Sequence, residues 1–141
     1  MRLVLDTNVV ASGLLWNGPP AALIELAKTG DIELFTSPPL LAELSNILPR
    51  PKFAKAIAAT GLPCEELVLG YIELARLVQP TTISPVIKAD PSDDQVLACA
   101  LAAQTDLIVS GDKHLHSLGG QYSGIRIVTA AEAVRLISET Q

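Results

Sequence analysis

The stretch Arg2-Leu3-Val4-Leu5-Asp6 decides the fold, because an uninterrupted apolar run of this length is typical of a strand that is buried on both faces of a sheet. A second such run, Leu107-Ile108-Val109-Ser110, is followed closely by Asp112. In an open α/β sheet the active crevice forms outside the carboxyl ends of the strands. We therefore expect Asp6 and Asp112 to lie at the same edge of one sheet.

Strand and helix signals alternate along the whole chain. We predict strands at 2–6, 32–36, 76–79, 107–110 and 125–128, and helices at 21–29, 38–48, 52–60, 65–75, 92–104 and from 130 onward. Loops are predicted at 17–20, 80–91 and around Gly119-Gly120, and Thr129 with Glu132 forms a predicted capping box. This alternation implies an α/β fold with three layers, α/β/α, and a central, mainly parallel sheet of about five strands.

Length and composition fit one domain, residues 1–141, in which 49% of the residues are hydrophobic. No apolar run approaches the length of a membrane span, and the first residues form a strand rather than a signal peptide, so we expect a cytoplasmic protein. Cys64 and Cys99 have neither metal-binding spacing nor a disulfide framework, and we interpret both as reduced thiols.

The net charge of −5 counts against a nucleic-acid partner, because such proteins are typically basic. Metal ions held by clustered acids would offset this by presenting positive charge to phosphates. Basic side chains also occur locally, at Arg50, Lys52 and Lys55 and at Lys113, His114 and His116. The simplest interpretation of both groups is a solvated surface.

Four acids stand where a metal-dependent nuclease needs them, two at strand ends and two on helices: Asp6, Glu43, Asp94 and Asp112. Taken singly, each has an ordinary explanation as a turn residue, a helix cap or a surface side chain. Capping alone does not require all four together. A carboxylate cluster without cysteine or histidine ligands suits Mg²⁺ or Mn²⁺.

Neighbouring residues support this set. Thr7 and Asn8 are small hydrogen-bonding residues placed to hold the Asp6 carboxylate. Asp93 and Asp94 both open the helix at 92–104 and point about 100° apart, and periodicity alone does not say which faces the crevice.

These residues together resemble the PIN-domain ribonucleases. The resemblance rests on Asp6-Thr7-Asn8-Val9-Val10-Ala11-Ser12-Gly13, on Glu43, on Asp90-Pro91-Ser92-Asp93-Asp94-Gln95-Val96-Leu97-Ala98-Cys99-Ala100 and on Ser110-Gly111-Asp112, which follow in the family's order. The match spans the whole chain and is most similar to the VapC-like toxins of type II toxin–antitoxin pairs. One departure is Leu115, where toxin-like members often carry an aromatic residue.

The resemblance implies a parallel sheet flanked by helices and an Mg²⁺- or Mn²⁺-dependent endoribonuclease. It implies metal-binding and catalytic roles for Asp6, Glu43, Asp94 and Asp112, and supporting roles for Asn8 and Ser110 beside those expected for Thr7 and Asp93. It selects Asp94 over Asp93 by its spacing from the Leu97-Ala98 pair. We expect Asp6 and Asp94 to be the main metal ligands. The substrate-binding residues stay open.

Two other functions compete with this one. The first is a catalytically silent PIN-like module that binds RNA or a protein, which the acidic net charge favours. The second is a DNA-directed, structure-specific nuclease, although such enzymes usually carry long insertions that this chain has no room for. The expected partners are RNA, an antitoxin protein and a second copy of the chain, through Trp16-Asn17-Gly18-Pro19-Pro20 and the helix at 21–29.

Overall fold

The computed structural model describes residues 1–84 and 91–140, and for residues 91 and 92 it describes the backbone only. Asp90, which opens the third motif of the family resemblance, and half of the predicted loop at 80–91 therefore lie outside the described residues.

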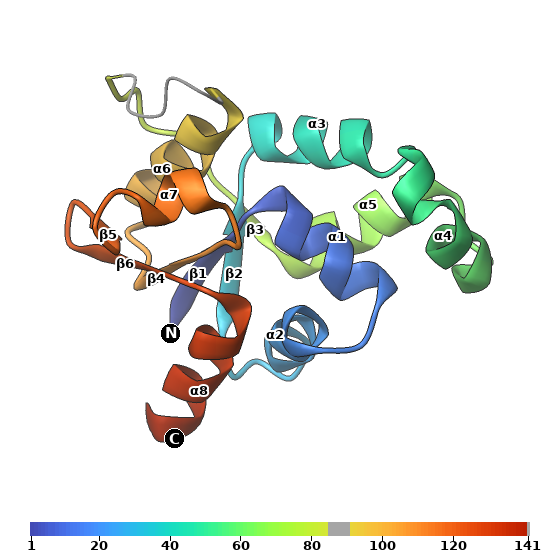
Figure 1. The fold of residues 1–141 in the computed structure, drawn as a ribbon, viewed down its shortest axis with the longest axis horizontal. Helices are drawn as coiled ribbons and strands as arrows, with labels where there is room; N and C mark the ends of the chain where they lie inside the picture. Colours follow the sequence, from blue (N-terminus) through green and yellow to red (C-terminus); the bar gives the residue numbers. More distant parts are fainter. Residues whose placement is uncertain (85–90, 141) are drawn as a thin grey trace.

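The described strands form one six-stranded sheet in the order β3-β2-β1-β4-β6-β5 (Figure 1). Five of them are parallel: β1 (Arg2–Leu5), β2 (Glu33–Thr36), β3 (Arg76–Leu77), β4 (Leu107–Val109) and β6 (Ile125–Val128). β5 (Gln121–Tyr122) pairs with β6 in the antiparallel sense. The mainly parallel sheet expected from the sequence is thus confirmed.

Helices cover both faces of this sheet. One face packs against α1 (Thr7–Leu15), α2 (Pro19–Lys28), α3 (Pro38–Ile47), α5 (Cys64–Leu74) and α8 (Ala130–Thr140). The other face packs against α6 (Pro91–Ala103) and α7 (Lys113–His116). A 3₁₀ turn (Pro51–Phe53) and α4 (Ala54–Thr60) lie beyond α3, at the right of Figure 1.

Successive residues of the central strands enter different cores, which explains why these strands are apolar without alternation. In β1, Leu3 and Leu5 belong to the core beneath α1 and α3, whereas Val4 belongs to the core beneath α6. In β4, Val109 and Ile108 divide between the two cores in the same way.

Several local predictions are confirmed. The predicted capping box at the start of α8 is present, because the Glu132 backbone N–H donates to Thr129 Oγ1 (3.2 Å) and the Thr129 backbone N–H donates to Glu132 Oε1 (3.3 Å). Both cysteines are free, and burial raises the pKa of the Cys99 thiol to about 12, which marks it as a packed core residue. Among the described residues, none of the helices is long and apolar enough to span a membrane.

Three elements were not predicted: α1, α7 and β5. α1 escapes a search for helical periodicity because its buried residues Val9, Val10 and Ala11 are consecutive rather than spaced by three or four. α7 has only four residues and β5 only two, which is too short to leave a pattern.

Gly13 allows α1 to lie close against α2. A Cβ atom at this position would come within 2.6 Å of Ile24 Cδ1 and 2.9 Å of the Pro20 carbonyl oxygen. The second contact is with backbone, which cannot turn away. The glycine that ends the first motif of the sequence is therefore required for packing.

We expect Gly13→Ala to lower the free energy of unfolding by about 1–3 kcal/mol, as overpacking does. Gly70→Ala in α5 is the matched control, because its Cβ would meet no atom within 4 Å. That change should stabilise the protein by about 0.5–1 kcal/mol, since alanine favours a helix more than glycine does. Urea denaturation of both variants measures the difference, and equal stability would contradict the packing role of Gly13.

Candidate active site at the switch point of the sheet

The topology of the sheet creates a natural site between β1 and β4. From β1 the chain passes to β2 on one side, and it returns later to β4 on the other side. The connections therefore diverge at this point, and such a switch point leaves a crevice outside the carboxyl ends of the two strands. Asp6 follows β1 directly, and Ser110 follows β4 directly.

Asp6 is almost completely buried, with 6% of its surface exposed, and three donors hold its carboxylate. The Ser110 hydroxyl donates to Oδ2 at 2.7 Å. The Thr7 hydroxyl and the Asn8 backbone N–H both donate to Oδ1 at 3.4 Å, and through the second of these contacts Asp6 is the N-cap of α1. Thr7 and Ser110 thus contact Asp6 through their side chains, whereas Asn8 contacts it through its backbone, and the supporting role of the Asn8 side chain stays a prediction.

Asp112 is joined to the same group of side chains through Ser110. The Asp112 backbone N–H donates to Ser110 Oγ at 2.9 Å, so this one hydroxyl links the two strand-end aspartates. The Asp112 carboxylate also accepts from the His114 backbone N–H at 2.7 Å and caps α7. Asp6 and Asp112 therefore each cap a helix and also take part in the candidate site.

Asp6 and Asp112 line one hollow of about 420 Å³ that opens to the surface. Its remaining walls come from the first turns of α1, from the start of α2, from the β4–α7 connection and from the start of α8: Asn8, Val9, Ser12, Pro20, Gly111 and Ala130. Ser12 lies in the first motif of the family resemblance, whereas Ala130 was not predicted at the site, because it begins a helix whose own pattern is amphipathic.

Burial sets the protonation of Asp6. Desolvation raises the pKa of this carboxyl above its ordinary value, and the negative charge of Asp112 raises it further. Hydrogen bonds from Ser110, Asn8 and Thr7 act in the opposite direction. The site thus holds a carboxylate whose charge is costly without a compensating cation.

His116 steadies the loop that carries Asp112. Its Nε2 lies 2.6 Å from the Ser110 carbonyl oxygen, so this ring nitrogen donates a hydrogen bond there. The half-buried ring therefore fixes the backbone between β4 and α7. Sequence reasoning assigned this histidine to the surface, because a contact across six residues of an irregular loop has no periodic signal.

The two acids of α6 occupy different environments. Asp93 is 4% exposed and shares a helical stripe with Leu97 and Ala100, which pack toward the sheet. Asp94 is half-buried and lines a separate hollow with residues of the 80–83 segment and with Gln95 and Ala98. The hollow that contains Asp6 and Asp112 is not lined by Asp94.

Glu43 lies on α3, half-buried beside the predicted stripe of Leu40, Leu44 and Ile47, which is confirmed as buried. Glu43 lines neither of these two hollows. Across the described ranges, no three acidic, histidine or cysteine side chains gather closely enough to hold an ion. The structure thus unites Asp6 and Asp112 and leaves Glu43 and Asp94 apart from them.

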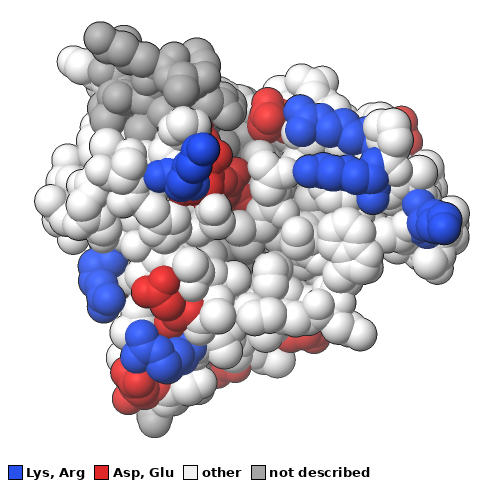
Figure 2. Space-filling model, viewed as in Figure 1, with Lys and Arg blue, Asp and Glu red and all other residues white. Residues whose placement is uncertain are grey.

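Charge is distributed unevenly on this side of the molecule. Figure 2 shows acidic side chains in a depression at the centre of the face, near the end of β1 and the start of α7. Basic side chains flank it, over α7 on one side and over the end of α3 and α4 on the other (Figure 2).

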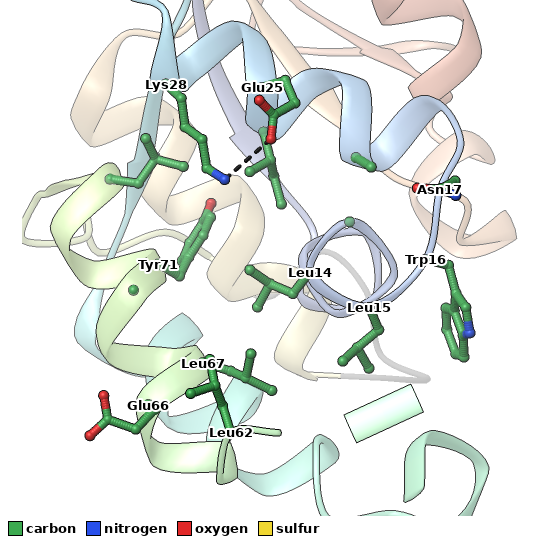
Figure 3. A pocket seen from close by; sticks show the side chains of 15 residues that line it. Leu14, Leu15, Trp16, Asn17, Glu25, Lys28, Leu62, Glu66, Leu67 and Tyr71 are labelled. Carbon is green, nitrogen blue, oxygen red and sulfur yellow. Dashed lines mark hydrogen bonds and ion pairs between the residues drawn. The ribbon is translucent and has the colours of Figure 1, made fainter. Parts of the chain in front are cut away.

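A third hollow, of about 400 Å³, lies between α1, α2 and α5 (Figure 3). Leu14, Leu67 and Tyr71 contribute apolar surface to it, and the exposed Glu25–Lys28 ion pair (3.2 Å) stands at its margin. This wall lacks a group of converging carboxylates.

The raised pKa of Asp6 predicts a specific pH dependence of stability in EDTA. As pH rises from the ordinary carboxyl value through the raised pKa, the unfolded chain loses the Asp6 proton first, so this residue's contribution to stability falls. The melting temperature of Asp6→Asn minus that of wild type should therefore be a larger number at neutral pH than at acidic pH. Asp31→Asn, at an exposed site, is the control. A difference that does not change with pH would contradict the prediction.

The roles of the two α6 acids can be separated by paired substitutions. If the predicted choice of Asp94 is right, Asp94→Asn should abolish divalent-metal binding and Asp93→Asn should spare it. Asp93 lies on the sheet-facing stripe of α6. This position favours the opposite result, in which Asp93→Asn abolishes metal binding and Asp94→Asn spares it. Isothermal titration with Mn²⁺ measures both variants against wild type, with thermal melts to confirm folding.

Comparison with known proteins agrees with this architecture. The chain is 27% identical over 128 residues to the uncharacterized protein MJ1680 of Methanocaldococcus jannaschii, a match that covers 90% of this chain and 81% of that protein. It is also similar to the solved structure of the PIN domain of human SMG5, with a TM-score of 0.50 and 13% identity over the full length of both chains. The second likeness concerns the fold alone.

The family model of the PIN domain matches residues 2–114, which include β1, both aspartates of the hollow at the switch point and the start of α7. The three-layer architecture, the strand order and this match lead to one conclusion: the chain belongs to the PIN-domain family.

Proposed function

We propose that this protein is a divalent-metal-dependent endoribonuclease. PIN domains are generally nucleases, and they typically use divalent metals. The observation that carries the proposal for this chain is the pair of strand-end aspartates, Asp6 and Asp112, joined through Ser110 in one open hollow at the switch point of the sheet.

The donor set of the hollow fits Mg²⁺ or Mn²⁺. Both ions prefer carboxylate oxygens, and Mg²⁺ is usually held by one or two carboxylates together with water and substrate phosphate. Asp6 and Asp112 supply that number of carboxylates. A cation would also offset the cost of the buried Asp6 charge. When bound, such an ion lowers the pKa of a water and stabilises the charge that develops on the phosphate.

The residues of the hollow have separable roles in this proposal. Asp6 is the principal ligand, because its carboxylate is held in one orientation by the Ser110 and Asn8 contacts. Asp112 is the second ligand at the hollow. Asp94 and Glu43 do not line this hollow, so in this proposal they act on the ion through bridging water, with Asp93 the competing candidate on α6. A water-derived nucleophile leaves a 5′-phosphate on the product.

RNA is the proposed substrate rather than DNA. DNA-directed relatives need long insertions to grip a duplex, and apart from the segment between β3 and α6 the described connections of this chain are short. Within this proposal the protein is the toxin of a toxin–antitoxin pair and acts as a homodimer. The walls that α2 and α5 contribute to the apolar hollow, rather than Trp16, support association with an antitoxin helix or a second copy. Leu115 is fully buried, so the position where toxins often carry an aromatic residue serves the core here.

The decisive measurement is cleavage of end-labelled RNA and single-stranded DNA with Mg²⁺, Mn²⁺ or EDTA. We expect metal-dependent cutting of RNA that Asp6→Asn abolishes, and a loss of about 10- to 100-fold in Ser110→Ala, because residues that orient ligands contribute that much. Mg²⁺ or Mn²⁺ should also raise the melting temperature of wild type but not of Asp6→Asn.

Each alternative outcome identifies a different function. Cutting of DNA alone would favour the structure-specific nuclease. A metal-induced rise in melting temperature without cutting of either polymer would favour the silent binding module. Cutting that survives in Asp6→Asn would show that the activity does not come from this hollow.

A further inference from the structure

The segment from Leu44 to Cys64 is basic in an acidic protein. It contains Arg50, Lys52 and Lys55 and no aspartate or glutamate, whereas the chain as a whole carries a net charge of −5. All three side chains are exposed, and the segment comprises the end of α3, the 3₁₀ turn and α4. Its charge is therefore available to a ligand and is not neutralised by acids of the segment itself.

An exposed aromatic side chain borders this basic segment. Trp16, the only tryptophan of the chain, is the C-cap of α1 and remains 47% exposed. Its ring packs against the buried Phe53, with ring centroids 5.6 Å apart and planes inclined by 38°. Lys52 Nζ lies 4.9 Å from the centre of the same Phe53 ring, so the Lys52 cation and the Trp16 ring are both positioned against one buried aromatic side chain.

This surface is connected rigidly to the candidate active site. Asp6 caps the start of α1 and Trp16 caps its end, so one helix of nine residues separates them by about 15 Å. The basic side chains over α3 and α4 lie on the same face as the acidic depression (Figure 2). Close packing of α1 on α2 at Gly13 holds the helix in place.

The chemistry of this surface matches single-stranded nucleic acid. A base stacks on an exposed aromatic ring, and neighbouring phosphates are bound by arginine and lysine. An acidic protein needs such a local basic area, because the carboxylates of the depression repel a polyanion until a cation is bound. Lys28 and Arg135 differ from these side chains, because each is already paired with a glutamate.

We propose that Trp16, supported by Phe53, together with Arg50 and Lys52 forms a platform that binds single-stranded RNA beside the scissile position. The proposal rests on the proposed function for its substrate. Trp16 stacks on a base, and the two cations contact flanking phosphates. The platform holds the strand while the phosphate to be cut lies at the hollow of Asp6 and Asp112.

Binding is measured in EDTA on the Asp6→Asn background, so that cleavage cannot interfere. Because Trp16 is the only tryptophan, its fluorescence reports the platform directly. A short single-stranded RNA should quench this fluorescence, and an abasic strand of the same length should bind without equal quenching. This readout needs no substitution at Trp16.

Substitutions then separate stacking from charge. Trp16→Leu should weaken binding of labelled RNA, followed by fluorescence anisotropy, roughly 5- to 100-fold, and Trp16→Phe should restore part of it. Arg50→Gln with Lys52→Gln should reduce the slope of log affinity against log salt by about 1.4, since each phosphate contact on a single strand contributes about 0.7. Arg126→Gln, which removes an exposed charge on β6, is the matched control and should change neither quantity.

The outcomes distinguish this proposal from the proposed function. RNA that binds without quenching Trp16, or binds equally well to Trp16→Leu, would overturn the platform even if wild type cleaves RNA. Quenching and the expected losses would support the platform even if wild type cleaves nothing, and the nuclease assignment alone would then fail. Association of Trp16 with a second copy of the chain, seen as RNA-independent dimerisation lost in Trp16→Leu, would also overturn it.

Discussion

The Ser110 hydroxyl is the contact on which the candidate site depends. It is fully buried, it donates to Asp6 Oδ2 and it accepts from the Asp112 backbone N–H. Two chain segments more than a hundred residues apart in sequence are thereby locked at the ends of adjacent strands. A methyl group in its place would leave the Asp112 N–H and one Asp6 oxygen without this partner, and no other described contact joins the two aspartates directly.

The environment of Asp6 shows that a folded protein can contain a charged side chain that lowers the stability of the fold. Desolvation and the nearby Asp112 oppose ionisation, and three hydrogen bonds only partly offset them. A carboxylate of this kind is suited to binding a cation, because folding has already fixed its orientation. This combination of burial, fixed orientation and access through an open hollow is typical of functional sites rather than of ordinary helix caps.

Much of the fold could be predicted because apolar runs and turn residues are local signals. The strands β1, β4 and β6 and the capping box of α8 follow from residues that are neighbours in sequence. α1 could not be predicted from periodicity, since Val9, Val10 and Ala11 are buried on several sides at once. For the site, the strand-end aspartates and Ser110 could be placed by topology alone, whereas the choice between Asp93 and Asp94 depends on helix rotation. The packing of Leu97 and Ala100 against the sheet sets the rotation of α6, and this packing cannot be predicted from any single residue.

The sheet ends in a two-residue strand at each edge, β3 on one side and β5 on the other. So little unpaired backbone offers a poor template for a further strand, and the exposed Arg76–Glu33 ion pair adds charge at the β3 edge. Copies of this chain are thereby discouraged from joining into a continuous sheet or from aggregating through strand addition. Association through helical surfaces is favoured instead, and the crevice at the carboxyl ends of the strands stays accessible where such a contact does not cover α1 or α7.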